Sequence, residues 1–375
     1  MINYISKLED LLSHAISESA KSAPFPNEIV LYGAGSIGRE CILLLQSKGV
    51  LVRAVIDAKS ALRQLEGVPV LHPEDLSFSA EEKAVIPVVI SIFNHQISML
   101  DVQAVIESAG WGNVTGFLQF HRQYAADIGD RYWLTAPSFY NLQRQGWREG
   151  SELWHDDESS RLYCDILKFR FTADYQDAPL PHPGVQYFPG DIPSWRKNLR
   201  FVDCGAFDGD TLEILTRQDL QIDAIAAFEP DGANLEILSK KLKAIGASAR
   251  PAALWPCGVH SSTTQLRFSS GQGAGSAISA SGDTVVQCVS LDDVLVGFQP
   301  NLIKMDIEGA EYGALLGARK LIETHRPGLA ICVYHHPAHL WEIPALVKSW
   351  NLDYSFFLRV HYYNGFDLVM YAVPS

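Results

Sequence analysis

Short apolar segments alternate with amphipathic ones along much of this chain, most regularly after Arg200. Strand-like apolar runs lie there at 200–204, 223–228, 249–255, 302–306 and 329–334, with helical patterns between them near 210–217, 231–245 and 310–325. This order predicts an α/β fold with a doubly wound, parallel sheet. The final runs, 354–358 and 368–373, are joined by a short loop containing Asn364-Gly365, so we expect the sheet to end in an antiparallel strand.

A shorter series of the same kind precedes this one. A strand-like run from Glu28 and a glycine-rich turn are followed by segments to about Lys48 and at 51–57, 68–71, 85–93, 95–109 and 114–120. We therefore expect a smaller α/β unit over residues 25–120. Ahead of it, apolar residues recur with helical spacing from Ile2 to Ile16, without the continuous apolar block of a signal peptide, so we expect a cytoplasmic protein.

Residues 121–199 differ in composition and are rich in Trp, Tyr, Arg and Pro. One amphipathic helix is predicted from about Asp156 to Phe171, with acidic residues in its first turn, and prolines then mark irregular structure. The length of 375 residues exceeds what one core usually holds. We expect an N-terminal domain at 1–121, a helical and irregular connector at 122–199, and a C-terminal domain at 200–375.

Composition narrows the class of partner. The formal net charge of −13 argues against nucleic acid and against an anionic membrane surface, so we expect a small-molecule partner. The longest apolar run, 84–93, is too short to span a bilayer and is predicted to be a buried strand. The six cysteines form no C-x-x-C pair, which favours reduced core thiols. A homo-oligomer is compatible with these features, and the sequence does not set the oligomeric state.

The most informative motif is Phe201-Val-Asp-Cys-Gly-Ala-Phe-Asp-Gly-Asp-Thr-Leu212, which predicts a strand, a tight turn and the start of a helix. Gly205 and Gly209 let the backbone approach a ligand closely, and Glu229 ends the next strand, where a carboxylate can accept both hydroxyls of a ribose. The alternative is an ordinary turn between strand and helix. The pattern D-x-G-x-x-x-G-x-T resembles S-adenosylmethionine-dependent methyltransferases. The expected cofactor-binding residues are Asp203, Gly205, Ala206, Asp208, Gly209, Thr211, Glu229, Pro230 and Asn234.

The N-terminal series carries its own G-x-G-x-x-G turn at Gly33, Gly35 and Gly38. Asp57 ends the following strand at the distance expected of a residue that binds a ribose, which is the Rossmann arrangement. The unit is similar to the nucleotide-sugar-binding front domains of sugar-modifying enzymes. A nucleotide or nucleotide-sugar ligand, a packing or oligomer role, and a working NAD site are the alternatives.

A second cluster of candidate chemistry lies at Leu302–Glu311. Alternation predicts that Lys304, Asp306 and Glu308 share one face at the carboxyl end of the fourth strand, where open α/β sheets bind ligands. We expect this edge to bind or deprotonate a substrate hydroxyl. The alternative is structural: Lys304 would pair with Asp306 or Glu308, and Glu311 would cap its helix.

Two histidines, His335 and His336, end the next strand beside this edge. Either is a candidate general base, although a hydrogen-bonded structural histidine is the simpler assignment. Carboxylates at the edge could also hold Mg²⁺, but one strand does not supply a ligand set, so no metal ligand is assigned. The expected catalytic residues are Lys304, Asp306, Glu308, His335 and His336.

Taken together, residues 200–373 resemble the FkbM family of S-adenosylmethionine-dependent O-methyltransferases. The resemblance rests on the first motif, on Glu229, Pro230 and Asn234, on Ser290-Leu-Asp-Asp293, and most of all on Lys304-Met-Asp-Ile-Glu-Gly-Ala-Glu311. It implies a class I methyltransferase fold and methylation of a hydroxyl on a sugar, nucleotide-sugar, polyketide or related small molecule. It implies nothing about residues 1–199, because the minimal family lacks that part.

Two rival functions remain. One is an NAD(P)- or nucleotide-sugar-dependent enzyme acting through the N-terminal glycines, and the other is a non-catalytic nucleotide-binding module. An intact Asp306-Ile-Glu308 edge favours the methyltransferase, because a binding module does not need it. The Gly/Ser-rich stretch 269–282 joins two strand candidates, and we expect it to be a mobile flap near the acceptor pocket or an idle loop.

Overall fold

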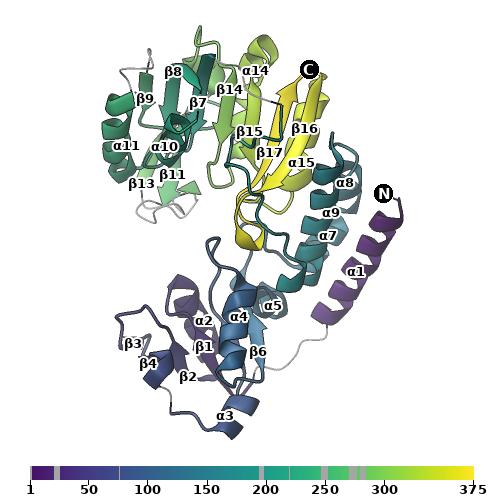
Figure 1. The fold of residues 1–375 in the computed structure, drawn as a ribbon, viewed down its shortest axis with the longest axis vertical. Coiled ribbons are helices and arrows are strands. Elements are labelled where there is room, and N and C mark those ends of the chain that lie inside the picture. Colours follow the sequence, from purple (N-terminus) through teal and green to yellow (C-terminus); the bar gives the residue numbers. More distant parts are fainter. Residues whose placement is uncertain are drawn as a thin grey trace. The chain divides into compact units, whose positions relative to one another are not determined.

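The computed structural model describes residues 2–20, 26–75, 77–193, 198–218, 220–245, 252–269, 277–278 and 284–375 (Figure 1). The chain forms two compact units. Unit 1 comprises Met1–Arg144, Tyr163–Pro181 and Tyr362–Phe366, and unit 2 comprises Gln145–Leu162, His182–His361 and Asp367–Ser375. Residues of the expected connector, 122–199, thus occur in both units, and the boundary crosses helix α9 (Asp157–Thr172).

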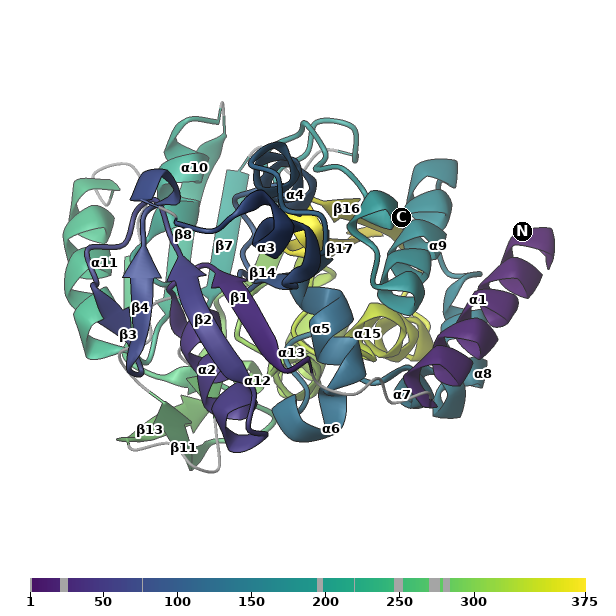
Figure 2. The same ribbon diagram turned by 90° about the horizontal axis from the view of Figure 1, so that it is seen from below.

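Unit 1 is built on a six-stranded sheet in the order β3-β4-β2-β1-β5-β6. Figure 2 shows β3, β4, β2 and β1 side by side in this order. Its strands are β1 (Glu28–Tyr32), β2 (Leu51–Ile56), β3 (Gln64–Leu65), β4 (Val68–Leu71), β5 (Val88–Ile90) and β6 (Val114–Gly116). Neighbouring strands are parallel except β3, which runs antiparallel to β4. Val30 and Leu31 of β1 are fully buried, as expected of a central strand in a parallel sheet.

The helices of unit 1 are α1 (Ile2–Ala20), α2 (Ser36–Ser47), α3 (Ala80–Val85), α4 (Met99–Ser108), α5 (Phe117–Gln123), α6 (Ala125–Ile128) and α7 (Pro137–Leu142), with 3-10 turns at Pro73–Asp75 and Tyr175–Asp177. Helix α2 buries Ile37, Cys41 and Leu45, which recur every fourth residue and so face one side.

Two N-terminal elements differ from the expectation. The segment 114–120 is not one element, because the chain turns at Gly116, where a Cβ atom would lie 2.5 Å from the ring of Tyr175, and continues as α5. The run 84–93 contains only the short strand β5, since its first residues end α3 and Pro87 separates the two.

Unit 2 contains a seven-stranded sheet in the order β16-β17-β15-β14-β7-β8-β9, which Figure 1 shows from edge to edge. Its strands are β7 (Asn198–Cys204), β8 (Gln221–Phe228), β9 (Ala252–Trp255), β14 (Leu302–Met305), β15 (Gly328–Cys332), β16 (Tyr354–Val360) and β17 (Leu368–Pro374). Strand β17 is antiparallel to both neighbours and the other pairs are parallel. The predicted doubly wound sheet with an antiparallel final strand is confirmed.

A small second sheet, in the order β10-β13-β11-β12, also belongs to unit 2. Its strands are β10 (Gly258–Val259), β11 (Thr264–Ser269), β12 (Ala277–Ile278) and β13 (Thr284–Val289). Most of the stretch 269–282, for which a flap was expected, lies outside the described residues.

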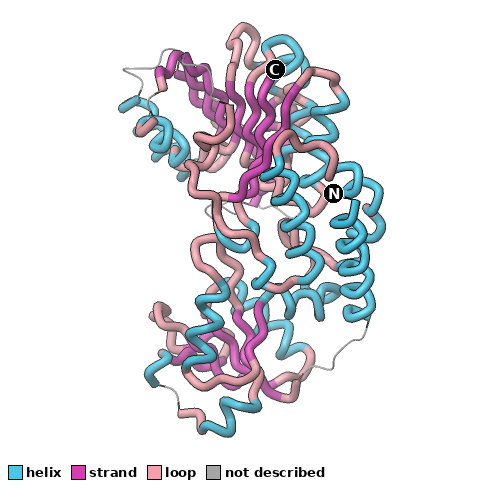
Figure 3. The backbone as a smooth tube through the Cα atoms, turned by 45° about the vertical axis from the view of Figure 1, so that its right-hand side comes forward, coloured by secondary structure: helices cyan, strands magenta, loops and turns pink. Residues whose placement is uncertain are grey.

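The helices of unit 2 surround its strands (Figure 3). They are α8 (Arg144–Gly150), the start of α9, α10 (Asp210–Thr216), α11 (Gly232–Ile245), α12 (Leu291–Val294), α13 (Glu311–Leu316), α14 (Arg319–His325) and α15 (His339–Ser349). The helix expected at 310–325 is broken at Gly317, whose carbonyl accepts the Ser290 hydroxyl at 2.8 Å. A Cβ atom at Gly317 would lie 2.2 Å from the carbonyl of His260, so close packing requires glycine there.

All six cysteines are free and buried, as the sequence predicted. Among the described residues, no helix is both long and apolar enough to cross a bilayer.

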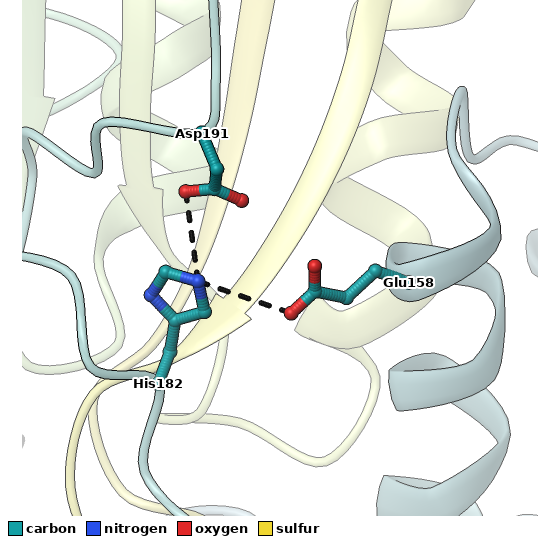
Figure 4. Close-up of side chains that lie close together, drawn as sticks. All are labelled: Glu158, His182 and Asp191. Atoms are coloured by element: carbon teal, nitrogen blue, oxygen red, sulfur yellow. Dashed lines mark ion pairs between the residues drawn. The ribbon is translucent and has the colours of Figure 1, made fainter.

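A charged cluster joins the segments that precede β7 to the edge strand β16. The guanidinium of Arg359, 2 % exposed, donates to Asp191 at 2.7 Å and to Asp156 at 2.9 Å. It also donates to the hydroxyl of Ser159 at 2.9 Å. Figure 4 shows His182 of the same cluster, whose Nε2 lies 3.5 Å from Asp191 and 3.8 Å from Glu158. One buried cation thus holds segments some 170 to 200 residues away in sequence.

We expect Arg359→Leu to lower the free energy of unfolding by about 3 kcal/mol, because removing one partner leaves the grouped carboxylates without their buried cation. Arg319→Leu is the matched control, since Arg319 is half-exposed and pairs with Glu323 four residues away, and should cost under about 1 kcal/mol. Urea denaturation of both variants measures the difference. Equal effects would show that the cluster does not hold the edge of the sheet.

Candidate functional site

The turn after β7 is the centre of the candidate site. Gly205 has a φ of +77°, Phe207 of +46° and Gly209 of +89°, so three of five residues are left-handed. A Cβ atom at Gly205 would lie 1.9 Å from the carbonyl oxygen of Asp306, so glycine lets the ends of β7 and β14 approach each other. The turn and the acidic edge after β14 are therefore neighbours.

A buried ion pair supports this turn. Lys304 lies 3.0 Å from Asp203, and their side chains are 2 % and 0 % exposed. The ammonium also donates to the carbonyl oxygen of Gly205. Burial raises the pKa of Asp203 to about 6 although Lys304 opposes the shift, and the carboxylates around Lys304 raise the pKa of the ammonium.

This placement corrects two assignments. Lys304 was expected on the ligand-facing edge, and in the alternative as the partner of Asp306 or Glu308, but it is buried with Asp203 beneath the turn. Asp203 was expected to contact a cofactor, and that prediction stands; its buried carboxylate lies 3.0 Å from the ammonium of Lys304. The shared face of residues 304, 306 and 308 is also wrong, because β14 ends at Met305 and Glu308 lies in a left-handed turn.

Glu229 lies at the carboxyl end of β8 and is tied to the turn. Its Oε2 accepts the backbone N–H of Phe207 at 2.9 Å, and its Oε1 accepts that of Asp231 at 2.8 Å. Burial raises the pKa of Glu229, while these N–H groups and Asn234 oppose the shift. Each carboxylate oxygen has two lone pairs, so Oε2 keeps capacity for a further donor.

The other residues of the first motif build the turn. Ala206 is fully buried and donates its N–H to Phe228, and Thr211 is buried at the start of α10. Asp208 pairs with Lys241 at 3.2 Å. Pro230 directly follows Glu229, and the amide of Asn234 donates to Oε1 of Glu229 at 3.4 Å.

The acidic edge begins where β14 ends. Asp306 accepts the hydroxyl of Tyr187 at 2.8 Å, and its other oxygen lies 3.3 Å from Nε2 of His335. Glu308 follows with a φ of +54° and lies 3.8 Å from the same nitrogen. Left-handed non-glycine residues cost about 1–3 kcal/mol and cluster at functional sites.

His335 is buried and lies close to several carboxylates, so it is not a base on the surface. Its Nδ1 lies 2.7 Å from Glu311, and its side chain is 0 % exposed. Burial lowers the pKa of His335, but Glu311, Glu308 and Asp306 outweigh this and raise it to about 10. His336 is exposed, and its Nδ1 accepts the N–H of Ala338 at 3.2 Å.

The electrostatics of the edge are dominated by crowded carboxylates. Burial raises the pKa of Glu308 to about 8, with Asp306 and Glu311 adding to the shift and His335 opposing it. Burial and Asp306 raise the pKa of Asp367, which precedes β17, to about 7. Groups with such values can exchange protons near neutral pH.

In the N-terminal turn, as in the turn after β7, a carboxylate at the end of the next strand accepts a backbone N–H of the turn. Asp57 accepts the N–H of Ala34 at 2.8 Å, as Glu229 accepts that of Phe207, and also accepts those of Lys59 and Ser60. A Cβ atom at Gly33 would meet Ile92 at 2.6 Å, and one at Gly38 would meet the Gly33 carbonyl at 2.2 Å, so packing requires both glycines. At Gly35 a Cβ atom would meet nothing within 4 Å.

Two groups of described side chains place possible metal ligands within 4.8 Å of one another. In Glu158–His182–Asp191, Nδ1 of His182 accepts the N–H of Gly184, so a neutral ring carries its proton on Nε2, the nitrogen that faces the carboxylates. In Asp306–Glu311–His335, one oxygen of Glu311 accepts the N–H of Ile307 and also contacts His335. These atoms already contact other groups of the protein, so we assign no metal ion to either group.

Sequence reasoning missed three residues of this site. Tyr187 comes from the irregular segment before β7, and Asp367 from the loop before β17, so neither lies in a motif. Glu311 was considered only as a helix cap, and it does accept the N–H of Ile307, but it also orients His335. Its place in the string Asp306-Ile-Glu-Gly-Ala-Glu311 was the one available signal.

The strand order of unit 2, the antiparallel β17 and the turn after β7 define a class I methyltransferase fold. Residues 203–359 match the model of the methyltransferase FkbM domain. The structure is similar to methyltransferase FkbM from Methylobacillus flagellatus KT, with a TM-score of 0.77 and 20 % identity over 98 % of this chain and 100 % of that one. That likeness, which shows the fold, also covers unit 1.

An rRNA methylase from Streptococcus thermophilus matches 48 % of this chain and 90 % of its own at 14 % identity, but its TM-score of 0.28 is too low to inform the fold. No curated protein sequence matches the chain.

We expect Gly205→Ala to lower the melting temperature by about 5 °C or more and to distort the turn, because the new Cβ meets the Asp306 carbonyl and the left-handed backbone is strained for alanine. Gly232→Ala is the control, since a Cβ atom there meets nothing within 4 Å. Thermal denaturation compares the two. A Gly205→Ala protein as stable as the control would contradict the close approach of β7 and β14.

Proposed function

We propose that the protein transfers a methyl group from S-adenosylmethionine to a hydroxyl of a small molecule, such as a sugar, nucleotide-sugar or polyketide-type metabolite. The observation that carries this proposal is the pairing, in a region that matches the methyltransferase FkbM domain, of the Gly205 turn with the carboxylate of Glu229. The acidic edge after β14 lies directly beside that turn.

The residues fit the cofactor by their chemistry. Glu229 would hold the ribose hydroxyls with its remaining acceptor capacity, and the turn from Gly205 to Gly209 would hold the amino acid portion. S-adenosylmethionine supplies a methyl group already activated on a sulfonium, so the protein's task is to orient the acceptor oxygen and remove its proton. Asp306 and Glu308 are the partly exposed carboxylates of the edge and are suited to both tasks.

We expect Glu229→Gln to weaken S-adenosylhomocysteine binding about ten- to a hundredfold, because hydrogen bonds to a charged acceptor contribute about 1.5–3 kcal/mol. Isothermal titration calorimetry measures the affinity. Asp223→Asn, at the opposite end of β8, is the control and should bind like the wild type. If Glu229→Gln folds and binds S-adenosylhomocysteine with unchanged affinity, the ribose assignment fails.

We also propose that unit 1 binds a nucleotide or nucleotide-sugar at the Gly33–Gly38 turn. The observation that favours this is Gly35: its φ of −84° suits any residue, and its Cβ position is open, so neither the backbone nor packing calls for glycine. A glycine that the chain itself does not need leaves room for a ligand to approach the start of α2.

Gly35→Val should leave the melting temperature within a few degrees of the wild type, because its side chain enters open space. It should reduce binding of at least one member of a panel of UDP-glucose, UDP-N-acetylglucosamine, NAD⁺ and ATP at least tenfold by calorimetry. Wild-type protein that binds none of these at millimolar concentration, or binds them as well after the substitution, would leave unit 1 with a packing role only.

A further inference from the structure

Three carboxylates follow β14 within six residues, and their surroundings assign them different tasks. Glu311 is fully buried, and one of its oxygens accepts the N–H groups of Ile307 at 2.9 Å and Gly309 at 3.4 Å. The same oxygen lies 2.7 Å from Nδ1 of His335. Glu311 therefore shapes the turn and orients the imidazole, and it cannot reach a bound acceptor.

Asp306 is held on both oxygens by groups of the protein. One oxygen accepts the hydroxyl of Tyr187 at 2.8 Å, and the other faces His335 at 3.3 Å. Tyr187 is itself fixed, because its backbone is left-handed at a φ of +65° and its N–H donates to the hydroxyl of Tyr371 at 3.0 Å. Both contacts hold the Asp306 carboxylate in place.

Glu308 differs from both. Its side chain is partly exposed, at 17 %, as is that of Asp306, at 23 %. Unlike Asp306, Glu308 has its nearest cation, Nε2 of His335, 3.8 Å away, beyond hydrogen-bond distance. Within the described part of the chain, no donor forms a hydrogen bond with its carboxylate. The backbone turns sharply here, with a φ of +54° at Glu308 and +101° at Gly309. Glu308 is thus the carboxylate of this edge that can take up a proton from outside.

We propose that Glu308 is the catalytic base that receives the acceptor's hydroxyl proton, and that Tyr187 and His335 are positioning residues that hold the Asp306 carboxylate in place beside it. This inference rests on the proposed methyl transfer. As the acceptor oxygen forms its bond to the methyl carbon, the carbon–sulfur bond breaks with its electron pair left on sulfur, and the hydroxyl proton passes to the Glu308 carboxylate. The resulting carboxylic acid returns the proton to water.

The charges around Glu308 suit this task. The carboxyl groups of Asp306, Glu311 on α13 and Asp367 ahead of β17 surround it, while His335 after β15 is the opposing cation. Burial and these carboxyl groups raise the pKa of Glu308 to about 8. A base is most effective when its pKa lies near the working pH.

The first test follows S-adenosylhomocysteine release with UDP-glucose and, separately, glycerol as hydroxyl probes. Glu308→Gln should slow release about a hundredfold or more while its calorimetric affinity for S-adenosylhomocysteine stays within threefold. Glu308→Asp should recover part of the rate. Asp306→Asn and Tyr187→Phe should retain more activity than Glu308→Gln, and the rise of rate with pH should move to lower pH in Asp306→Asn, which removes a neighbouring carboxylate. Glu323→Gln, exposed on α14, is the control with unchanged rate.

The second test needs no acceptor. The folded pKa of Glu308 lies above its ordinary value of 4.5, so the wild type loses stability as pH rises from about 4.5 to about 8. Glu308→Gln cannot ionise, so its melting temperature should match the wild type near pH 5 and exceed it increasingly up to pH 9. Glu323→Gln should show no such divergence.

Either of two results with the Glu308→Gln variant would overturn the inference: release of S-adenosylhomocysteine at the wild-type rate, or a melting-temperature difference from the wild type that stays constant from pH 5 to pH 9. The proposed function fails separately, if wild-type protein does not bind S-adenosylhomocysteine at all. Turnover that requires added Mg²⁺ and is lost with chelator would likewise overturn the inference, because a metal would then activate the hydroxyl in place of Glu308.

Discussion

The site depends on one buried ion pair. Lys304 and Asp203 come from adjacent parallel strands, β14 and β7, and lie opposite each other in the register of the sheet. Burying two charges is costly unless they are paired and well hydrogen-bonded, and the lysine meets this condition through Asp203 and the carbonyl oxygen of Gly205. The pair thereby fixes the turn after β7 against the end of β14. The Gly205 turn and the acidic edge are therefore held next to each other.

At the acidic edge, by contrast, carboxylates outnumber the positive groups. Asp306, Glu308, Glu311 and Asp367 crowd around one imidazolium, and two of these carboxyl groups have pKa values raised by burial and mutual repulsion. Left-handed backbone at Tyr187 and Glu308 adds strain to the same place. Lys304 is paired with one carboxylate inside the sheet, whereas several carboxylates at the edge share the single imidazole of His335. Strain and unfavourable charge at the edge are expected where reactive geometry is held at the expense of stability.

The sequence predicted most of the fold because the relevant signals are local. Period-two apolar runs, the glycines of the turn and the Asn364-Gly365 loop each determine structure within a few residues, and they predicted the positions of the strands and the antiparallel final strand. Sequence reasoning did not find the ends of elements where distant residues pack closely: Gly116 lies against Tyr175 and Gly317 against His260, and neither position leaves room for a Cβ atom. Predictions of the site residues also failed where long-range contacts decide their position. Alternation placed Lys304 on the ligand edge, whereas pairing across the sheet with Asp203 buries it, and Tyr187 reaches Asp306 across 119 residues of sequence.

The central claim is that a cofactor lies over the Gly205 turn with its reactive end toward Asp306 and Glu308. A crystal structure of the protein with S-adenosylhomocysteine tests this most directly. The account predicts ribose hydroxyls within hydrogen-bond distance of Glu229, the homocysteine chain along residues 205–209, and the sulfur facing the end of β14. Adenosine bound elsewhere, for example at the Gly33–Gly38 turn with the Gly205 turn empty, would contradict it.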